Sequence, residues 1–231
     1  MVLAASAEVL ARHEHGAHWL TAAERSRGAT LADRTSRSDF FAAHLLVRLC
    51  AAAVTGGSPG DLRIVQRCPS CGGPHGRPRL ADRTDIHLSL SHAGGVVAAA
   101  VGPDPLGVDV ERLRTLDGRA ALSARTLHPA ERSAVDRDPD PDRAFLRHWV
   151  RKEAVIKFGV GDLARMRRLD LSGLSPAGSD DAPRRLRLGP AGPELLLRDF
   201  ADDAYSVVGA LVHSVPTRPS TFEHKEREES Q

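Results

Sequence analysis

Two carboxylates stand two residues apart in the segment Gly107-Val108-Asp109-Val110-Glu111. On a β-strand, Asp109 and Glu111 project from one face while the two valines project from the other. Neighbouring carboxylates repel each other, and a divalent cation relieves that repulsion. Mg²⁺ suits such a pair because it prefers oxygen ligands and retains positions for phosphate oxygens. Taken alone, the pentapeptide is more typical of a strand with one hydrated face.

A second charged cluster lies in Trp149-Val-Arg-Lys-Glu-Ala-Val-Ile-Lys157, where Trp149, Glu153 and Lys157 share one face of a helix. An ordinary ion pair between Glu153 and Lys157 would account for the spacing. However, lysine occurs only at positions 152, 157 and 225, so 29 of the 32 basic residues are arginine. Because arginine serves equally well in an exposed helical pair, lysine at 152 and 157 indicates that a compact ammonium group is required.

Patterning along the chain predicts the elements that position these residues. Helical periodicity and capping signals predict helices over 22–27, 38–54, 119–136 (broken near Pro129) and 144–158. Strands are predicted over 61–66, 86–91, 96–101 and 106–111, with three more between 184 and 212. Interleaved helices and strands favour an α+β or α/β fold. We divide the chain into subdomains 1–105 and 106–215 and a disordered polar tail, 216–231.

Composition excludes several classes of protein. The 231 residues are 41% hydrophobic and 27% charged, with a net charge of +2, which is typical of a soluble globular chain. Near-neutral charge argues against a dedicated nucleic-acid binder. No apolar run reaches the roughly 18 residues that span a bilayer, and we find no signal peptide. Three cysteines cannot form a disulfide framework, so we expect a reducing cytoplasm.

The cysteine pair Cys68-Pro-Ser-Cys71, with His75 four residues further on, is typical of half a zinc knuckle. A structural zinc requires four ligands, and only His87 or His92 could complete the set. The alternative is that this segment is a turn without metal.

The motifs together resemble the 4′-phosphopantetheinyl transferase superfamily, of the Sfp-like type. The carrying segments are G-V-D-V-E (107–111) and W-V-R-K-E-A-V-I-K (149–157), in that order. Three further segments are similar: D-R-T-S-R-S-D-F-F-A-A-H-L-L-V-R (33–48), H-G-R-P (75–78) and L-S-L-S-H-A-G-G (88–95).

The resemblance implies a pseudo-twofold α+β monomer in which each half is a sheet packed on a long helix. Coenzyme A and Mg²⁺ would bind between the halves. The enzyme, a holo-[acyl-carrier-protein] synthase, would transfer phosphopantetheine to a serine of an acyl or peptidyl carrier protein and release 3′,5′-ADP. The carrier protein and coenzyme A are therefore the expected partners, with no nucleic acid and no membrane.

The resemblance also implies roles for individual residues. Asp109, Glu111 and Glu153 would hold Mg²⁺, and Glu153 would take the proton of the serine. Lys157 would neutralise phosphate oxygens, and both Lys152 and Lys157 would flank Glu153 on the helix that faces the pyrophosphate. The expected coenzyme A contacts are Arg25, Arg27, Arg77, Ser91, His92, Asp109 and Lys157.

Two other functions stay open at this point. One is a nucleic-acid-binding module that uses the zinc-like turn and the arginine clusters, although the few aromatic residues count against it. The other is a different Mg²⁺-dependent phosphotransferase, although the sequence lacks the glycine-rich Walker loop of many ATP-binding enzymes.

Overall fold

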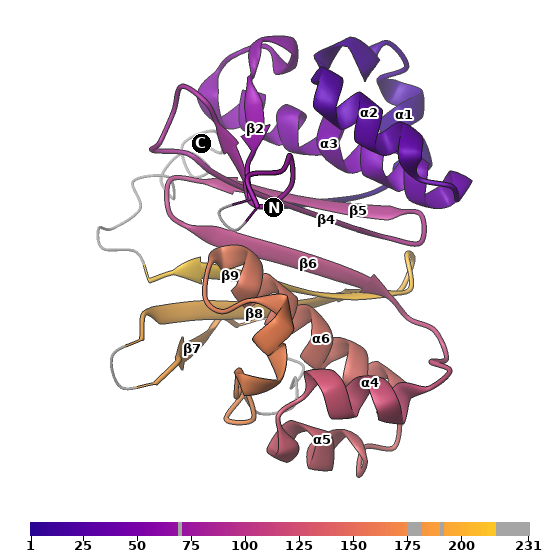
Figure 1. Ribbon diagram of the computed structural model, residues 1–231, viewed down its shortest axis with the longest axis vertical. Helices are drawn as coiled ribbons and strands as arrows, with labels where there is room; N and C mark the ends of the chain where they lie inside the picture. The colour runs from indigo at the N-terminus through magenta and orange to yellow at the C-terminus, as the bar shows by residue number, and fades with distance from the viewer. Residues whose placement is uncertain (69–70, 175–181, 190–191, 216–231) are drawn as a thin grey trace, which may run out of the picture.

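Strands β1 to β5 form an antiparallel sheet in the computed structural model, which describes residues 1–68, 71–174, 182–189 and 192–215 (Figure 1). The strand order is β1-β5-β4-β3-β2. The bounds are β1 Val2–Ala5, β2 Ile64–Gln66, β3 Pro78–Leu80, β4 His87–Ala93 and β5 Val96–Gly102. The helices of this half are α1 Ser6–Arg12, α2 Ala22–Thr30 and α3 Arg34–Thr55, with 3₁₀ turns at Gly16–Trp19 and Pro59–Asp61.

The second half repeats the plan with four antiparallel strands in the order β6-β9-β8-β7. The strands are β6 Leu106–Arg112, β7 Arg184–Arg187, β8 Glu194–Asp202 and β9 Val207–Ser214. Its helices are α4 Arg119–Thr126, α5 Pro129–Val135 and α6 Pro141–Phe158, followed by a 3₁₀ turn at Leu163–Arg168. The α+β class, with one long helix on each sheet, is therefore confirmed.

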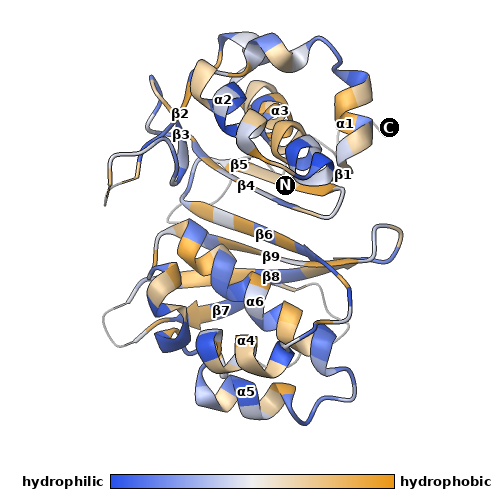
Figure 2. Cartoon of the chain, turned by 45° about the vertical axis from the view of Figure 1, so that its right-hand side comes forward, coloured by the Kyte–Doolittle hydropathy of each residue, from blue (hydrophilic) through white to orange (hydrophobic). Residues whose placement is uncertain are grey.

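The two sheets lie between the two long helices (Figures 1 and 2). Alternate residues of β5 show this layering: Val97 and Ala99 pack in one core with α3, whereas Val96 and Ala98 pack in another core with β6. A strand buried on both faces carries a continuous apolar sequence, which explains the run V-V-A-A-A-V. A separate core joins α6 to β8 and β9.

Helix α3 is long and apolar enough to cross a membrane, judged by length and composition alone. Most of that stretch is buried, and Ala42, Ala43 and Val47 have no exposed surface. The apolar face packs on the first sheet, so α3 serves here as a core helix.

Element boundaries differ from those predicted where polar side chains cap a helix. Asp33 accepts a hydrogen bond from the backbone of Ser36 at 2.6 Å, so α3 begins four residues before the predicted start. Asp140 caps α6 in the same way. Thr21 and Glu24 form a capping box at the start of α2, and the predicted break near Pro129 is confirmed. Sequence patterning missed β1, α1 and β3, which are short.

The division into subdomains at residues 105 and 106 stays a prediction. The predicted tail, 216–231, lies outside the described residues.

Candidate active site between the two halves

Strand β6 and helix α6 approach each other closely at Gly107. A Cβ atom at this position would lie 2.1 Å from the carbonyl oxygen of Ala154 and 2.5 Å from the amide nitrogen of Phe158. Only glycine permits this contact between backbones. The glycine therefore brings the carboxylate strand against the helix that carries Glu153 and Lys157.

The free edge of β6 is joined to β4 by two serines. The Val108 amide donates to Ser89 Oγ at 3.0 Å, and the Val110 amide donates to Ser91 Oγ at 3.3 Å. Because β6 pairs with β9 on its other side, these amides would otherwise be unsatisfied at a buried sheet edge. The alternating L-S-L-S sequence of β4 thus fastens one half of the molecule to the other.

A cleft of about 530 Å³ opens beside this junction. Both halves line it: β4 and the segment 75–78 from the first half, and β6 and α6 from the second. Eight of the nine predicted site residues lie along its wall: Arg27, Arg77, Ser91, His92, Asp109, Glu111, Glu153 and Lys157.

Asp109 is the most buried carboxylate of the cleft, with 4% of its surface exposed. Its Oδ1 atom accepts hydrogen bonds from Ser91 Oγ and from Lys157 Nζ, both at 2.6 Å. Its Oδ2 atom is buried and has no hydrogen-bond partner among the described residues. A buried carboxylate oxygen without a partner is costly, and a bound cation would satisfy it.

Burial and the negative charges of the cleft raise the pKa values of both Glu111 and Glu153. Burial first, and then the Asp109 carboxylate, raise the pKa of Glu153 to about 7, while Lys157 opposes the shift. Burial and then Asp109 also raise the pKa of Glu111. These are the expected effects of carboxylates that share one partly dry site, and the oxygen donors fit Mg²⁺.

Lys157 is positioned by both halves. Its ammonium group donates to the backbone oxygen of Leu90 at 3.2 Å as well as to Asp109. No ion pair joins Lys157 to Glu153 in the described part of the chain, so the ordinary i,i+4 pair considered from the sequence does not form.

Lys152 flanks Glu153 on α6, but its side chain is not among the residues that line the cleft. Its side chain is fully buried and pairs with Glu131, also fully buried, at 2.7 Å. It also donates to the backbone oxygens of Thr126, Met166 and Leu169 at 2.6 to 3.2 Å. Four acceptors around one small cation explain why lysine is present here instead of arginine.

The other predicted contacts have varied surroundings. Partial burial lowers the pKa of His92 at the cleft wall, opposed by Asp39. Ser91 donates its single hydroxyl proton to Asp109, so it positions that carboxylate, and its ligand contact stays a prediction. Arg25 donates to the backbone oxygen of Leu20 and is not among the residues that line the cleft.

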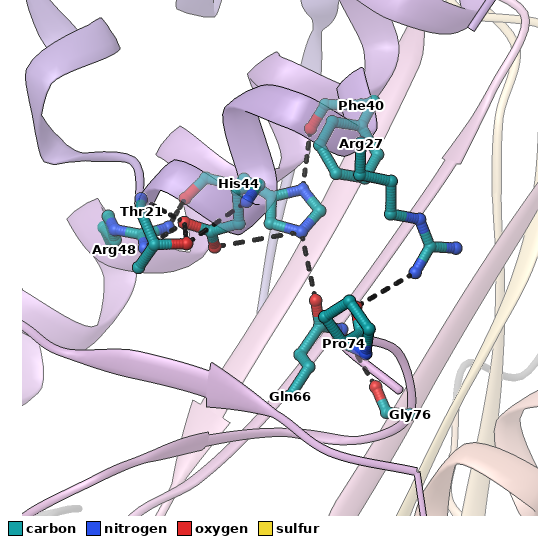
Figure 3. Close-up of polar contacts among 9 residues, drawn as sticks. Thr21, Arg27, Phe40, His44, Arg48, Gln66, Pro74 and Gly76 are labelled. Atoms are coloured by element: carbon teal, nitrogen blue, oxygen red, sulfur yellow. Dashed lines mark hydrogen bonds and ion pairs between the residues drawn. The ribbon is translucent and has the colours of Figure 1, made fainter. Parts of the chain in front are cut away.

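Hydrogen bonds to Gln66 and Arg27 hold the loop before Arg77 in place (Figure 3). Gln66 donates to the Gly76 carbonyl at 2.8 Å, and Arg27 donates to the Pro74 carbonyl at 3.4 Å. His44 links this loop to α3, because its ring contacts both Gln66 and the Phe40 carbonyl. The Arg77 guanidinium lies against Gly159, which ends α6. Arg77 therefore bridges the two walls of the cleft.

Sequence reasoning missed some lining residues. Gln66, Ser89 and Leu163 lie along the cleft but were assigned no role; Gln66 and Leu163 lie outside every motif, whereas Ser89 lies in the segment 88–95. For Ser89, the alternation of leucine and serine in β4 was the sequence feature that could have indicated its position.

Comparison with known proteins identifies the family. The model of the 4′-phosphopantetheinyl transferase superfamily matches residues 105–204, which include Asp109, Glu111, Glu153 and Lys157. Over residues 105–204 the chain matches the 4′-phosphopantetheinyl transferase superfamily, and its curated relatives are named as such transferases.

Relatives within this superfamily extend the similarity into the first half. A 4′-phosphopantetheinyl transferase of Bacillus subtilis is 27% identical over 173 residues, covering 73% of this chain and 71% of the relative. The transferase HetI of Nostoc sp. is 26% identical, covering 75% of this chain and 72% of its own. The transferase Sfp of Bacillus subtilis strain 168 is 31% identical over 86 residues, covering 36% and 37%.

Proposed function

We propose that the protein transfers the 4′-phosphopantetheine arm of coenzyme A to a serine of an acyl or peptidyl carrier protein. This is the activity of a holo-[acyl-carrier-protein] synthase. The observation that carries the proposal is the cleft between the halves, where three carboxylates and one lysine meet and one buried carboxylate oxygen lacks a partner. Similarity to the transferase superfamily supports the same reaction.

The reaction places a particular demand on these residues. The serine oxygen attacks the phosphorus that bears pantetheine, the bond from that phosphorus to the bridging oxygen breaks, and 3′,5′-ADP leaves. Such transfers depend mainly on positioning and on neutralising charge.

Asp109, Glu111 and Glu153 are the proposed Mg²⁺ ligands, and the bound ion would neutralise pyrophosphate oxygens. Glu153 is also the proposed acceptor of the serine proton, because a pKa of about 7 lies near the operating pH of a general base. Lys157, held between Asp109 and Leu90, offers its charge to the phosphate oxygens of the leaving group.

Arg77 and His92 are proposed contacts for coenzyme A, since both line the cleft. Arg27 lines it as well and extends from α2, and with Arg25 it is the proposed contact for the 3′-phosphate. Because one chain supplies both walls, we propose that the enzyme acts as a monomer. The cytoplasm is the proposed compartment.

Mass spectrometry of an apo carrier protein tests the proposal. Incubation with coenzyme A, Mg²⁺ and this protein is expected to add one phosphopantetheine. Glu153→Gln and Lys157→Ala should each lower the rate about 100-fold or more while the fold is kept. Glu8→Gln, on the exposed surface of α1, is the matched control and should leave the rate unchanged. Absence of the mass gain on several carrier proteins, or near-normal rates for both cleft variants, would overturn the proposal.

A further inference from the structure

The loop between β2 and β3 brings two thiols and an imidazole together. The Sγ atoms of Cys68 and Cys71 and a ring nitrogen of His75 all lie within 4.8 Å of one another. Cys71 Sγ is 3.0 Å from His75 Nε2. Cys71 and His75 are solvent-exposed, so an ion in solution can reach them.

Backbone hydrogen bonds close the described part of this loop. The amide of Gly72 donates to the Cys68 carbonyl at 2.9 Å, and the amide of Cys68 donates to the Gly73 carbonyl at 3.0 Å. Gly72 has a φ of 71°, which favours glycine directly after the second cysteine. The Gly73 amide donates to Cys71 Sγ at 3.4 Å.

Gly73 also keeps open the space between the ligand atoms. A Cβ atom there would lie 3.3 Å from both Cys71 Sγ and His75 Nε2. A larger residue would therefore crowd both ligand atoms at once. Two thiolates and an imidazole are ligands that Zn²⁺ prefers, whereas Mg²⁺ prefers oxygen.

We propose that Cys68, Cys71 and His75 bind a zinc ion that fastens the β2–β3 loop at the mouth of the cleft. Three protein ligands leave the fourth coordination position to solvent, so this is an open site and not the four-ligand site considered from the sequence, whose candidate histidines do not join this cluster in the described residues. Two thiolates balance the charge of the ion, so the site is electrically neutral.

The location would let the ion hold the loop in place beside the cleft. The loop buries little apolar surface, and its other fastenings are the hydrogen bonds at Pro74 and Gly76 (Figure 3). His75 and Arg77 both line the cleft, two residues apart. A zinc ion bound to His75, together with the hydrogen bonds at Pro74 and Gly76, would hold the backbone before Arg77 in place and so fix the direction of the Arg77 side chain.

Metal binding is tested on the full chain, purified under reducing conditions, by elemental analysis and by titration with Co²⁺ alone. We expect one zinc per chain as purified. For the metal-free protein, Co²⁺ should give the charge-transfer and intense visible bands of tetrahedral thiolate ligation. Cys71→Ser and His75→Gln should each lower the metal content several-fold and weaken these bands.

Two control variants separate this site from other thiols and imidazoles. Cys50→Ser, on helix α3, and His15→Gln, on the surface, should retain the metal content and the spectrum. Absence of thiolate bands from the wild type would overturn the proposal, as would a Cys68–Cys71 disulfide in the reduced preparation or an unchanged spectrum in Cys71→Ser. None of these readouts depends on phosphopantetheine transfer, so the proposed function can fail without affecting the result.

Discussion

At the scale of single residues, His148 on α6 has an unusual environment. Its Nδ1 atom is buried and lacks a hydrogen-bond partner among the described residues, beside a small cavity of about 130 Å³. Burial, together with the nearby charges of Arg151, Lys152 and Arg147, lowers the pKa of His148 from 6.5 to about 4, and only Asp199 opposes the shift. The folded protein therefore holds this imidazole neutral.

This shift predicts acid sensitivity. Between about pH 6.5 and about pH 4 the unfolded chain binds a proton at His148 that the folded chain does not. The unfolding free energy contributed by this residue is therefore present above that range and is lost as the pH falls through it. Urea unfolding across the range should show a smaller loss for His148→Gln than for the wild type.

The exposed His15 offers the control for this experiment, because His15→Gln should keep the wild-type dependence on pH. Equal slopes for His148→Gln and the wild type would contradict the prediction.

The lysines show what residue types in a sequence can reveal. Scarcity of lysine drew attention to positions 152 and 157, and both ammonium groups lie among several acceptors. It could not indicate where each group points, because adjacent helical positions differ by about 100° around the axis. The partner of Lys152, Glu131, is 21 positions earlier on another helix, and no local spacing connects the two.

At the scale of elements, the contact between β6 and α6 determines the shape of the cleft. Gly107 allows the backbones to touch, and Gly209 on the neighbouring strand β9 leaves room for the ring of Phe200 in the same sheet. Sequence patterning identified the strand and the helix. It could not explain why the carboxylate motif begins with glycine, because Gly107 contacts Ala154, which lies 47 positions further along the chain.

We predict that Gly107→Ala moves α6 away from β6. The added methyl group meets backbone atoms, which cannot shift as a flexible side chain can. The expected loss of unfolding free energy is about 1–3 kcal/mol, typical of overpacking. Transfer to a carrier protein should fall as well, because Glu153 and Lys157 are displaced from Asp109. Thermal unfolding and the mass-spectrometric assay measure the two effects.

Gly173→Ala is the matched control, since a Cβ atom there meets nothing within 4 Å. If the two alanine variants were equally stable and equally active, the proposed role of the close contact would be wrong.

At the scale of the whole molecule, the halves are held together by an apolar layer and by the serines of β4. Val96, Ala98, Val108 and Val110 belong to this layer, and their apolar contacts alone do not specify how the sheets are aligned. Ser89 and Ser91 supply that alignment through the amides of Val108 and Val110.

Ser89→Ala should therefore destabilise the protein by more than the loss of one small hydroxyl group suggests. The change leaves the buried Val108 amide without an acceptor, at a cost of about 1–3 kcal/mol. Chemical unfolding would measure the difference. Ser133→Ala, at an exposed position of α5, should change the stability little. Equal effects of the two substitutions would show that the Ser89 bond contributes nothing.

The fold class and most cleft residues were predictable because motif order, apolar runs and caps are local features of the sequence. The environment of each group was not predictable, since it depends on contacts between distant segments. The unpartnered oxygen of Asp109 and the raised pKa of Glu153 both arise only when β6, β4 and α6 come together.

The pairing of β6 with β9 also determines when the second sheet can form while the chain is being synthesised. Leu106 pairs with His213, and β9 lies between β6 and β8 in the second sheet. The 94 residues from 113 to 206 must therefore be synthesised after β6 before that strand meets its sheet partner β9, whereas the pairing of β4 with β5 is local. The first half can fold while translation continues. The carboxylate strand is completed only when β9 emerges, so a chain that stops before β9 lacks the strand on which Asp109 depends.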